Sequence, residues 1–376
     1  MTMTTKLIIG ADISTLPEVE EQGGRFYDGG REAKLDDILA AHGVTSARLR
    51  VWNDPYDRQG RPYGGGTCDA EKMASLAKRL KDKGMSLLLD LHYSDFWCDP
   101  ARQGIPKAWQ GMTLDEMCEA LHAFTRQTLE TFISRGAAPE YVQVGNEITN
   151  GMLWEMAKLD RSSKEAFDQS FDRLAKLISS GTSAVREISD AEIVIHLEQS
   201  GKNALWREWF DAATTRGMDY DIIGASYYPL WHGTLENMRA NFDDMIGRCG
   251  KDIMIVETAY PFTTVHHDPE SRKLMIGDDF TLEDGSKPRW SFTKEGQQQF
   301  LEALKNECGK VRDGRLRAIY YWEPGWLPTK ASTWATKEAL RDIGEEDKGT
   351  GNEWANECLF DYGGNANPAL YTYGNQ

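Results

Sequence analysis

Eight short apolar runs recur along the chain and predict buried β-strands. Most are continuous in apolar residues instead of alternating with polar ones, a pattern typical of strands covered on both faces. The runs occupy residues 7–13, 47–52, 86–92, 141–147, 192–197, 221–228, 252–257 and 317–322. This pattern favours a parallel sheet with helices outside it.

Helical periodicity fills several intervals between these runs. The segments 69–83, 115–135 and 163–188 carry apolar residues three or four positions apart, and Gly84 and Gly136 follow the first two as helix-ending glycines. The apolar faces consist of Met73, Leu76 and Leu80, of Met117, Leu121, Phe124 and Phe132, and of Phe167, Phe171, Leu174 and Ile178. Strand and helix alternate about eight times, which predicts an α/β fold with a closed (β/α)8 TIM barrel. We expect residues 1–376 to form one domain.

A doubly wound sheet is the alternative α/β architecture. It is less favoured because no Gly-rich phosphate loop follows the first predicted strand. Gly64-Gly65-Gly66 is the only glycine run, and no Lys-Ser or Lys-Thr opens a helix after it. The closed barrel is therefore the prediction.

Two long connections follow the last two strands, at residues 261–291 and 323–364. Both are rich in charged residues, Gly and Trp. In a barrel they would lie at the rim formed by the carboxyl ends of the strands. We expect extended loops that wall a cleft there; the alternative is that they are solvated surface loops.

Charge and composition narrow the class of partner. The chain has 43 basic and 59 acidic residues, a net charge of −16, which disfavours nucleic acid and anionic lipid as partners. Its 12 Trp suit stacking on sugar rings, although about half are expected in the core. The six Cys include no C-x-x-C pair, so neither a zinc nor a redox motif is indicated.

The chain contains no run of 18 apolar residues, so no transmembrane helix is predicted. Its first residues lack the apolar region of a signal peptide. Either the protein is cytoplasmic, or a signal has been replaced by a short leader.

Polar residues cluster where the predicted strands end. In a barrel they would converge on one mouth, which is where barrel enzymes place their active sites. The set comprises Arg48, Arg50, Asp90, His92, Asn146, Glu147, His196, Tyr227, Tyr228, Glu257, Tyr320 and Trp322.

Glu147 and Glu257 end the fourth and seventh strands, where a carboxylate must be paired, hydrogen-bonded or shifted in pKa. Two such acids fit glycoside hydrolysis, in which one carboxyl is protonated and the other ionised. Their separation, about 5 Å for retention or about 6.5–9.5 Å for inversion, cannot be obtained from the sequence.

Structural roles are the alternative for each candidate. A lone strand-end Glu can be an ion-pair partner, Arg48 and Arg50 can brace the carboxylates, and Asp90 with His92 can form a satisfied core pair. Glu323 is predicted to be structural, because alternation along the strand points it away from the face of Trp322. The run His266-His267-Asp268 lacks a partner motif at ligand spacing, so no specific metal site is predicted.

Several motifs together resemble glycoside hydrolase family 53, the endo-β-1,4-galactanases. The similarity extends from about residue 8 to about residue 365, nearly the whole chain. The motifs are Gly10-Ala-Asp-Ile-Ser14, Arg48-Leu-Arg-Val-Trp52, Leu89-Asp-Leu-His-Tyr-Ser-Asp-Phe-Trp97, Val144-Gly-Asn-Glu-Ile-Thr149, Ser226-Tyr-Tyr-Pro229, Val256-Glu-Thr-Ala-Tyr-Pro261 and Tyr321-Trp-Glu-Pro324.

The resemblance implies a retaining endo-cleavage of β-1,4-galactan, the side chain of pectic type I arabinogalactan. Glu147 would be the acid/base, Glu257 the nucleophile and Asn146 the ligand of the sugar 2-hydroxyl. Arg48 would keep Glu257 ionised, a sixth-strand Tyr would hydrogen-bond it, and Trp322 would lie under the sugar. The expected substrate-binding set is Asn146, Arg48, Asp90, His92, Trp97, His196, Tyr227, Tyr228, Trp322 and Trp326, with Trp231 a further candidate.

The same resemblance bears on cofactors and location. No organic cofactor is implied, and no metal is expected to be required, although some bacterial members bind calcium near the late loops. The acids of residues 261–291 lack EF-hand spacing. A polymer substrate implies an extracellular, surface or periplasmic location, and we expect a monomer.

Two other functions stay open from the sequence. One is a related retaining barrel endoglycanase that acts on another β-1,4-glycan such as mannan or glucan. The other is a glycan-binding protein without catalysis, which the presence of both Glu147 and Glu257 disfavours.

Overall fold

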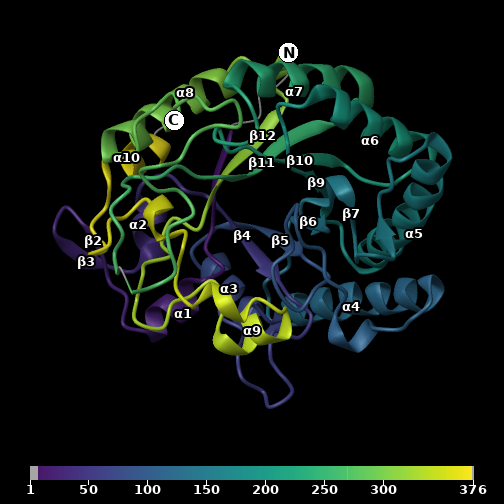
Figure 1. Ribbon diagram of the computed structural model, residues 1–376, viewed down its shortest axis with the longest axis horizontal. Coiled ribbons are helices and arrows are strands. Elements are labelled where there is room, and N and C mark those ends of the chain that lie inside the picture. The colour runs from purple at the N-terminus through teal and green to yellow at the C-terminus, as the bar shows by residue number, and fades with distance from the viewer. Residues whose placement is uncertain (1–6, 269, 375–376) are drawn as a thin grey trace.

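A closed barrel of parallel strands forms the centre of the molecule (Figure 1). The computed structural model describes residues 7–268 and 270–374. Neighbouring strands follow the order β1-β12-β11-β10-β9-β6-β5-β4, and pairing of β4 with β1 closes the ring. The strands are β1 (Ile8–Asp12), β4 (Ser46–Val51), β5 (Ser86–Leu91), β6 (Tyr141–Val144), β9 (Glu192–Leu197), β10 (Ile222–Ser226), β11 (Asp252–Thr258) and β12 (Leu316–Trp322). Each overlaps one predicted strand, and the (β/α)8 prediction is confirmed.

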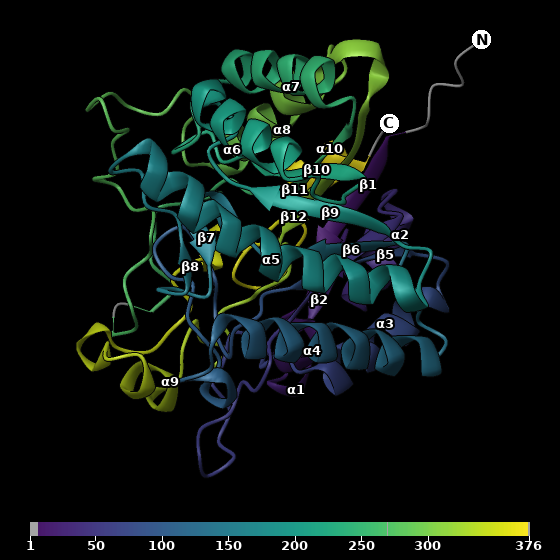
Figure 2. The same cartoon turned by 90° about the vertical axis from the view of Figure 1, so that its right-hand side faces the viewer.

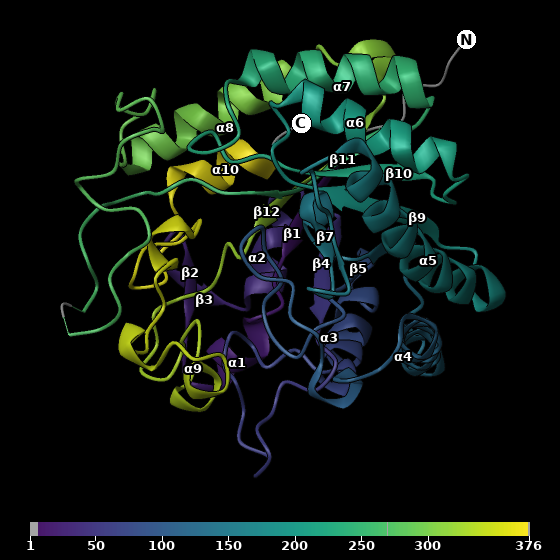
Figure 3. The same ribbon diagram turned by 45° about the vertical axis from the view of Figure 1, so that its right-hand side comes forward.

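Helices surround the barrel (Figures 1 and 3). They are α1 (Leu16–Glu21), α2 (Leu35–Ala41), α3 (Ala70–Lys81), α4 (Leu114–Ser134), α5 (Lys164–Ile188), α6 (Asn203–Thr215), α7 (Leu235–Cys249), α8 (Lys294–Cys308), α9 (Lys337–Asp342) and α10 (Pro368–Gly374). The three predicted helices correspond to α3, α4 and α5. The C-terminal α10 packs against α8, and the Tyr373 hydroxyl donates to the carbonyl of Gly10 on β1 at 2.6 Å.

Local sequence explains where these helices begin and end. The Asp69 side chain accepts a hydrogen bond from the Lys72 amide at the start of α3. Thr113 and Glu116 form a reciprocal capping box at the start of α4. Beyond the end of α3, Gly84 has φ +80°, a left-handed conformation that glycine adopts without strain.

The barrel interior changes from apolar to polar along the strand direction. Its apolar layer consists of Leu88, Tyr141, Val194, Ile222, Met254, Val256, Ala318 and Tyr320. Asp90, Gln143 and His196 each lie two positions after a member of this layer, so they face the interior too. A packed floor therefore supports a buried polar layer near the carboxyl ends of the strands.

Gly10 makes room for the Tyr320 ring within this floor. A Cβ at Gly10 would lie 2.3 Å from the Tyr320 ring, whose hydroxyl is hydrogen-bonded to Ser46. We expect Gly10→Ala to lower the free energy of unfolding by about 1–3 kcal/mol through overpacking, measured as a lower urea midpoint. Gly309→Ala is the control, because its Cβ would meet no atom closer than 3.6 Å. Equal midpoints for the two variants would contradict this role for Gly10.

The two long connections, the second of which contains α9, lie on the same side of the barrel as the hairpin formed by β7 (Gly151–Met152) and β8 (Ala157–Lys158) (Figure 2). They are joined to each other, since the Arg272 amide donates to the Thr350 carbonyl and the Arg272 guanidinium donates to Glu353. The small hairpins are β2 (Phe26–Asp28) with β3 (Arg31–Ala33), and β7 (Gly151–Met152) with β8 (Ala157–Lys158). Within residues 7–268 and 270–374, no helix is long and apolar enough to cross a membrane.

Candidate active site

A cleft of about 480 Å³ opens at the carboxyl ends of the strands and contains both predicted acids. Trp97 and Trp322 form part of its aromatic wall. Met275, from residues 261–291, and Trp334 and Trp354, from residues 323–364, also line it. The structure thus agrees with the expectation that the long loops wall a cleft.

Glu257 lies near the end of β11 and is held by a cation and a phenol. Its carboxylate is 2.8 Å from the Arg48 guanidinium and accepts a hydrogen bond from the Tyr228 hydroxyl at 3.1 Å. Burial raises the pKa of Glu257, and the Arg48 charge acts in the opposite direction. Burial also raises the pKa of Tyr228, so this phenol stays protonated and remains a donor.

Glu147 lies just beyond β6 and has a different electrostatic environment. Its Oε1 accepts a 2.6 Å hydrogen bond from Ser226. Burial raises the pKa of Glu147 well above its usual value, and the nearby charges of Glu257 and Glu198 raise it further. Among the described residues, no Lys or Arg forms an ion pair with Glu147. This environment favours the protonated acid, whereas Arg48 favours the ionised form of Glu257.

Arg48 organises the polar layer beneath the cleft. Besides Glu257, it contacts Asp12, Asp90 and Asn146, each at 2.8 Å. It is 1% exposed, so these bonds are made away from water, where they are strong and geometrically restrictive. The position of the Glu257 carboxylate is therefore fixed by an interior network.

The orientation of Asn146 is also fixed. Its side-chain oxygen accepts from Arg48 at 2.8 Å, and its nitrogen donates to the Cys98 carbonyl at 2.9 Å. The amide lines the cleft beside Glu147. A group held at both ends is suited to bind a substrate hydroxyl with little loss of side-chain entropy.

His92 lines the cleft and has a defined tautomer. Trp52 donates to its Nδ1 at 3.2 Å, so Nδ1 is an acceptor and Nε2 carries the proton. Nε2 then donates to Asp90 at 2.9 Å. Asp90 and His92 are thus a hydrogen-bonded pair of which only the histidine reaches the cleft.

His196 is hydrogen-bonded to Ser226, which is the partner of Glu147. Ser226 uses its one hydrogen to bond Glu147, so His196 Nε2, at 2.8 Å, must donate to Ser226. Burial lowers the pKa of His196 well below its usual value and keeps the ring neutral. The chain His196–Ser226–Glu147 orients the acid from below.

Four residues expected to bind substrate do not line the cleft. For Asp90, His196 and Trp326 the expectation is corrected, whereas Tyr227 lines a neighbouring cavity. Asp90 and His196 are 0% exposed and belong to the polar layer beneath it. Tyr227 points away from Tyr228, with its hydroxyl donating to the Gly233 carbonyl at 3.1 Å. Trp326 is 0% exposed and packs 5.8 Å from the Trp97 ring. Asp90, His196 and Tyr227 use their polar atoms in internal hydrogen bonds, and Trp326 is enclosed by packing.

Other residues of the site were not predicted. Ser226 contacts Glu147, and Asp12 and Gln143 contact Arg48. Their sequence signal is a polar residue within an apolar strand. Trp334 and Trp354 lie in irregular loops, where no spacing indicates which face of the chain meets a cleft.

Glu323 has the structural surroundings that alternation predicts. It contacts Arg50 and the Thr15 hydroxyl, each at 2.5 Å, and it does not line the cleft. In the late loops, His266 contacts the Arg272 carbonyl at 2.8 Å. The described residues include no group of three or more His, Cys, Asp or Glu placed to hold a metal ion.

A family model, named relatives and a solved structure indicate one family for this chain. The model for glycosyl hydrolase family 53 matches residues 8–373. The endo-beta-1,4-galactanase of Bacillus subtilis (strain 168) is 32% identical over 99% of this chain and 86% of its own length. Arabinogalactan endo-beta-1,4-galactanase A of Aspergillus niger is 34% identical over 86% of each chain. The solved GH53 catalytic domain of Ignisphaera aggregans has a TM-score of 0.87 at 36% identity, over 98% of this chain and 95% of that one.

Proposed function

The chain belongs to glycosyl hydrolase family 53, and on this premise we propose how its cleft hydrolyses β-1,4-galactan. The enzyme is a retaining endo-β-1,4-galactanase, as the family and its named members indicate. The observation that supports the assignment of roles is the contrast between the two acids. Glu257 contacts Arg48 at 2.8 Å, whereas Glu147 is buried beside other carboxylates.

In the first step, Glu257 attacks the anomeric carbon of the bound sugar. The bond from that carbon to the glycosidic oxygen breaks, and the proton of Glu147 moves to the departing oxygen. The products are a covalent glycosyl-enzyme ester and a shortened chain with a free hydroxyl. Tyr228 and Arg48 hold the attacking carboxylate in place.

In the second step, a water molecule replaces the departed chain. Glu147, now ionised, takes a proton from this water while the water oxygen attacks the anomeric carbon. The ester bond breaks and Glu257 leaves as a carboxylate beside Arg48. Two inversions give net retention, and both acids return to their starting states.

The remaining cleft residues would position the sugars. Asn146 has a fixed amide beside the acids and would bind the 2-hydroxyl. Trp322 would lie under the sugar at the cleavage point, with Trp97 and Trp231 extending the aromatic wall. His92 presents the edge of a ring held by Asp90.

The substrate class also indicates where the protein acts. A polysaccharide too large to cross a membrane is met outside the cytoplasm, so we place the enzyme outside the cell, at its surface or in the periplasm. We further propose that the enzyme acts as a monomer, because both acids and their hydrogen-bonding partners belong to the same chain.

Product release from linear β-1,4-galactan tests the function. We expect short galacto-oligosaccharides to appear rapidly from galactan and not from cellulose, mannan or xylan run in parallel. The products should initially carry the β configuration at the new reducing end, observed by NMR, because the mechanism retains it. If another polymer were cleaved and galactan were not, the substrate assignment would change to that polymer. Inactivity on all four polymers would favour a glycan-binding protein without catalysis.

A further inference from the structure

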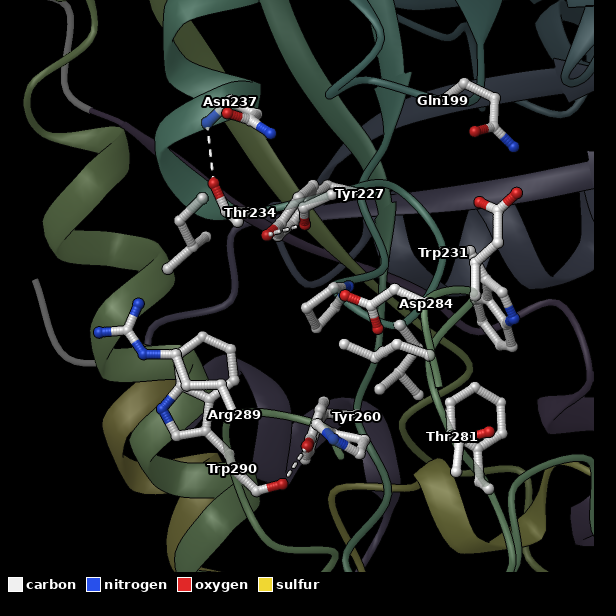
Figure 4. A pocket seen from close by; sticks show the side chains of 18 of the residues that line it. Gln199, Tyr227, Trp231, Thr234, Asn237, Tyr260, Thr281, Asp284, Arg289 and Trp290 are labelled. Atoms are coloured by element: carbon white, nitrogen blue, oxygen red, sulfur yellow. Dashed lines mark hydrogen bonds between the residues drawn. The ribbon is translucent and has the colours of Figure 1, made fainter. Parts of the chain in front are cut away.

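A second cavity, of about 640 Å³, adjoins the catalytic cleft. It is built by the loops that follow β9, β10 and β11, and it shares Gln199 and Trp231 with the cleft. Figure 4 shows these two residues on one side of the cavity, with Arg289 and Trp290 on the other. A molecule extending from the cleft past Trp231 would therefore enter it.

Trp231 stands at the boundary between the two hollows. It is half-buried, and its ring meets Tyr228, Phe280 and Trp354 at interplanar angles of 66°, 87° and 73°. These contacts are edge-to-face and hold the ring without stacking on it. A rigid, partly open indole between two cavities is suited to contact a sugar ring.

Gln199 carries two features that point to a ligand. Its backbone has φ +61°, a left-handed conformation that costs a non-glycine residue free energy. Its side-chain oxygen is buried and lacks a hydrogen-bond partner among the residues that the structure describes. A buried unsatisfied amide oxygen is destabilising, and a ligand hydroxyl would remove that cost.

The rest of the wall suits a neutral, hydroxyl-rich molecule. Two basic residues, Lys202 and Arg289, are balanced by the acidic Glu283 and Asp284, so the cavity has no net preference for an ion. Apolar rings alternate with short polar side chains in its lining, namely Tyr227, Tyr260, Phe280, Trp290, Thr234, Asn237 and Thr281. Aromatic faces combined with a few polar groups are typical of sugar sites.

We propose that this second cavity binds further sugar units of the substrate as a neutral saccharide subsite. The proposal rests on the proposed galactanase function. The sugar units belong either to the galactan backbone or to a branch carried by it, because both offer the same hydroxyl chemistry. Gln199 would accept a hydrogen bond from a hydroxyl, and Trp231 would guide the chain between the two hollows.

Thr281→Trp tests the proposal by filling the cavity. Thr281 is exposed and lines only the second cavity, so the larger ring can enter it without displacing the core. We expect kcat/KM on long or branched galactan to fall roughly three- to tenfold, the value of one lost aromatic contact. Activity on an aryl β-galactobioside, which is too short to reach the cavity, should be unchanged.

Asn237→Trp repeats the test from α7, and Asp278→Trp is the matched control. Asp278 is exposed on the same loop as Thr281 but lies outside the lining of both hollows, so this variant should behave as the wild type.

The substrates identify which sugars enter the cavity. A loss of kcat/KM confined to long linear chains identifies backbone sugars as the ligand. Loss confined to arabinose-branched chains identifies the branch.

Two results would overturn the proposal while leaving the proposed function intact. One is wild-type kcat/KM for both cavity-filling variants on every substrate. The other is an equal loss on the aryl galactobioside, which would mean that the variants damage the cleft. If the wild-type enzyme does not cleave galactan, that result would instead contradict the proposed function, and the proposed saccharide subsite would fail with it.

Discussion

Glu257→Gln is expected to reduce kcat on β-1,4-galactan by roughly 10⁴-fold or more, because the amide cannot form the glycosyl-enzyme ester. The fold should survive this change. Arg48 loses one carboxylate partner but keeps Asp12 and Asp90, each at 2.8 Å, so its charge stays paired in the interior. The measurement is kcat with galactan, together with oligosaccharide binding by calorimetry to establish that the cleft is intact.

Glu323→Gln is the matched control for this variant. Glu323 is another buried, Arg-paired glutamate at a strand end, but it lies outside the cleft lining. Its replacement should lower the melting temperature and leave turnover by the folded enzyme close to wild type. Substantial turnover by Glu257→Gln, or an equal loss in both variants, would remove Glu257 from the role of nucleophile.

Glu147→Gln is expected to reduce kcat on galactan by roughly 10²–10⁴-fold, because the leaving oxygen departs without a proton. An aryl galactobioside with an acidic phenol as leaving group should still react in the first step, so glycosyl-enzyme accumulates. Azide should then accelerate turnover, since it attacks the ester without needing a general base, and it should yield a β-galactosyl azide. The measurements are burst kinetics and product analysis with and without azide.

The pH profile gives a separate test of Glu147. The acid works only while protonated, so kcat/KM of the wild type should fall as pH rises through its pKa. Burial and the charges of Glu257 and Glu198 raise this pKa, which places the decline above the usual range of a glutamate. With the aryl substrate, Glu147→Gln should lose this alkaline limb. Retention of the limb would assign it to another group, and Glu155→Gln, on a side chain 80% exposed, should match the wild type.

The barrel could be predicted from the sequence because strand and helix signals are local. A strand covered on both faces needs a continuous apolar run, and a helix on the outside needs an apolar stripe with a cap. The chain provides both, as with Asp69 at the start of α3 and Gly84 beyond its end. Alternating elements then leave few topologies, because parallel strands require crossovers.

The two acids and their partners could also be proposed from strand ends. Arg48 lies on the face of β4 that alternation assigns to the interior, and the structure places it 2.8 Å from Glu257. The choice between Tyr227 and Tyr228 could not be made this way. Both follow β10, and a register shift occurs between Ala225 and Ser226, so the alternation of side chains is lost there.

The amino-acid sequence alone was sufficient to predict the order of the elements, the strand that carries each acid and the family to which the protein belongs. Only the tertiary structure decided which polar side chains reach the cleft. Asp90 and His196 lie near the carboxyl ends of β5 and β9, at the same end of the barrel as His92 and Glu147, yet they are buried in the layer below. How deep a side chain lies in the barrel depends on the stagger between neighbouring strands. It also depends on the backbone beyond the strands, as at Glu147 with φ 50°, and on loops that cover the mouth, such as the loop that carries Trp354. These features depend on residues far apart in the sequence, so they cannot be predicted from local periodicity.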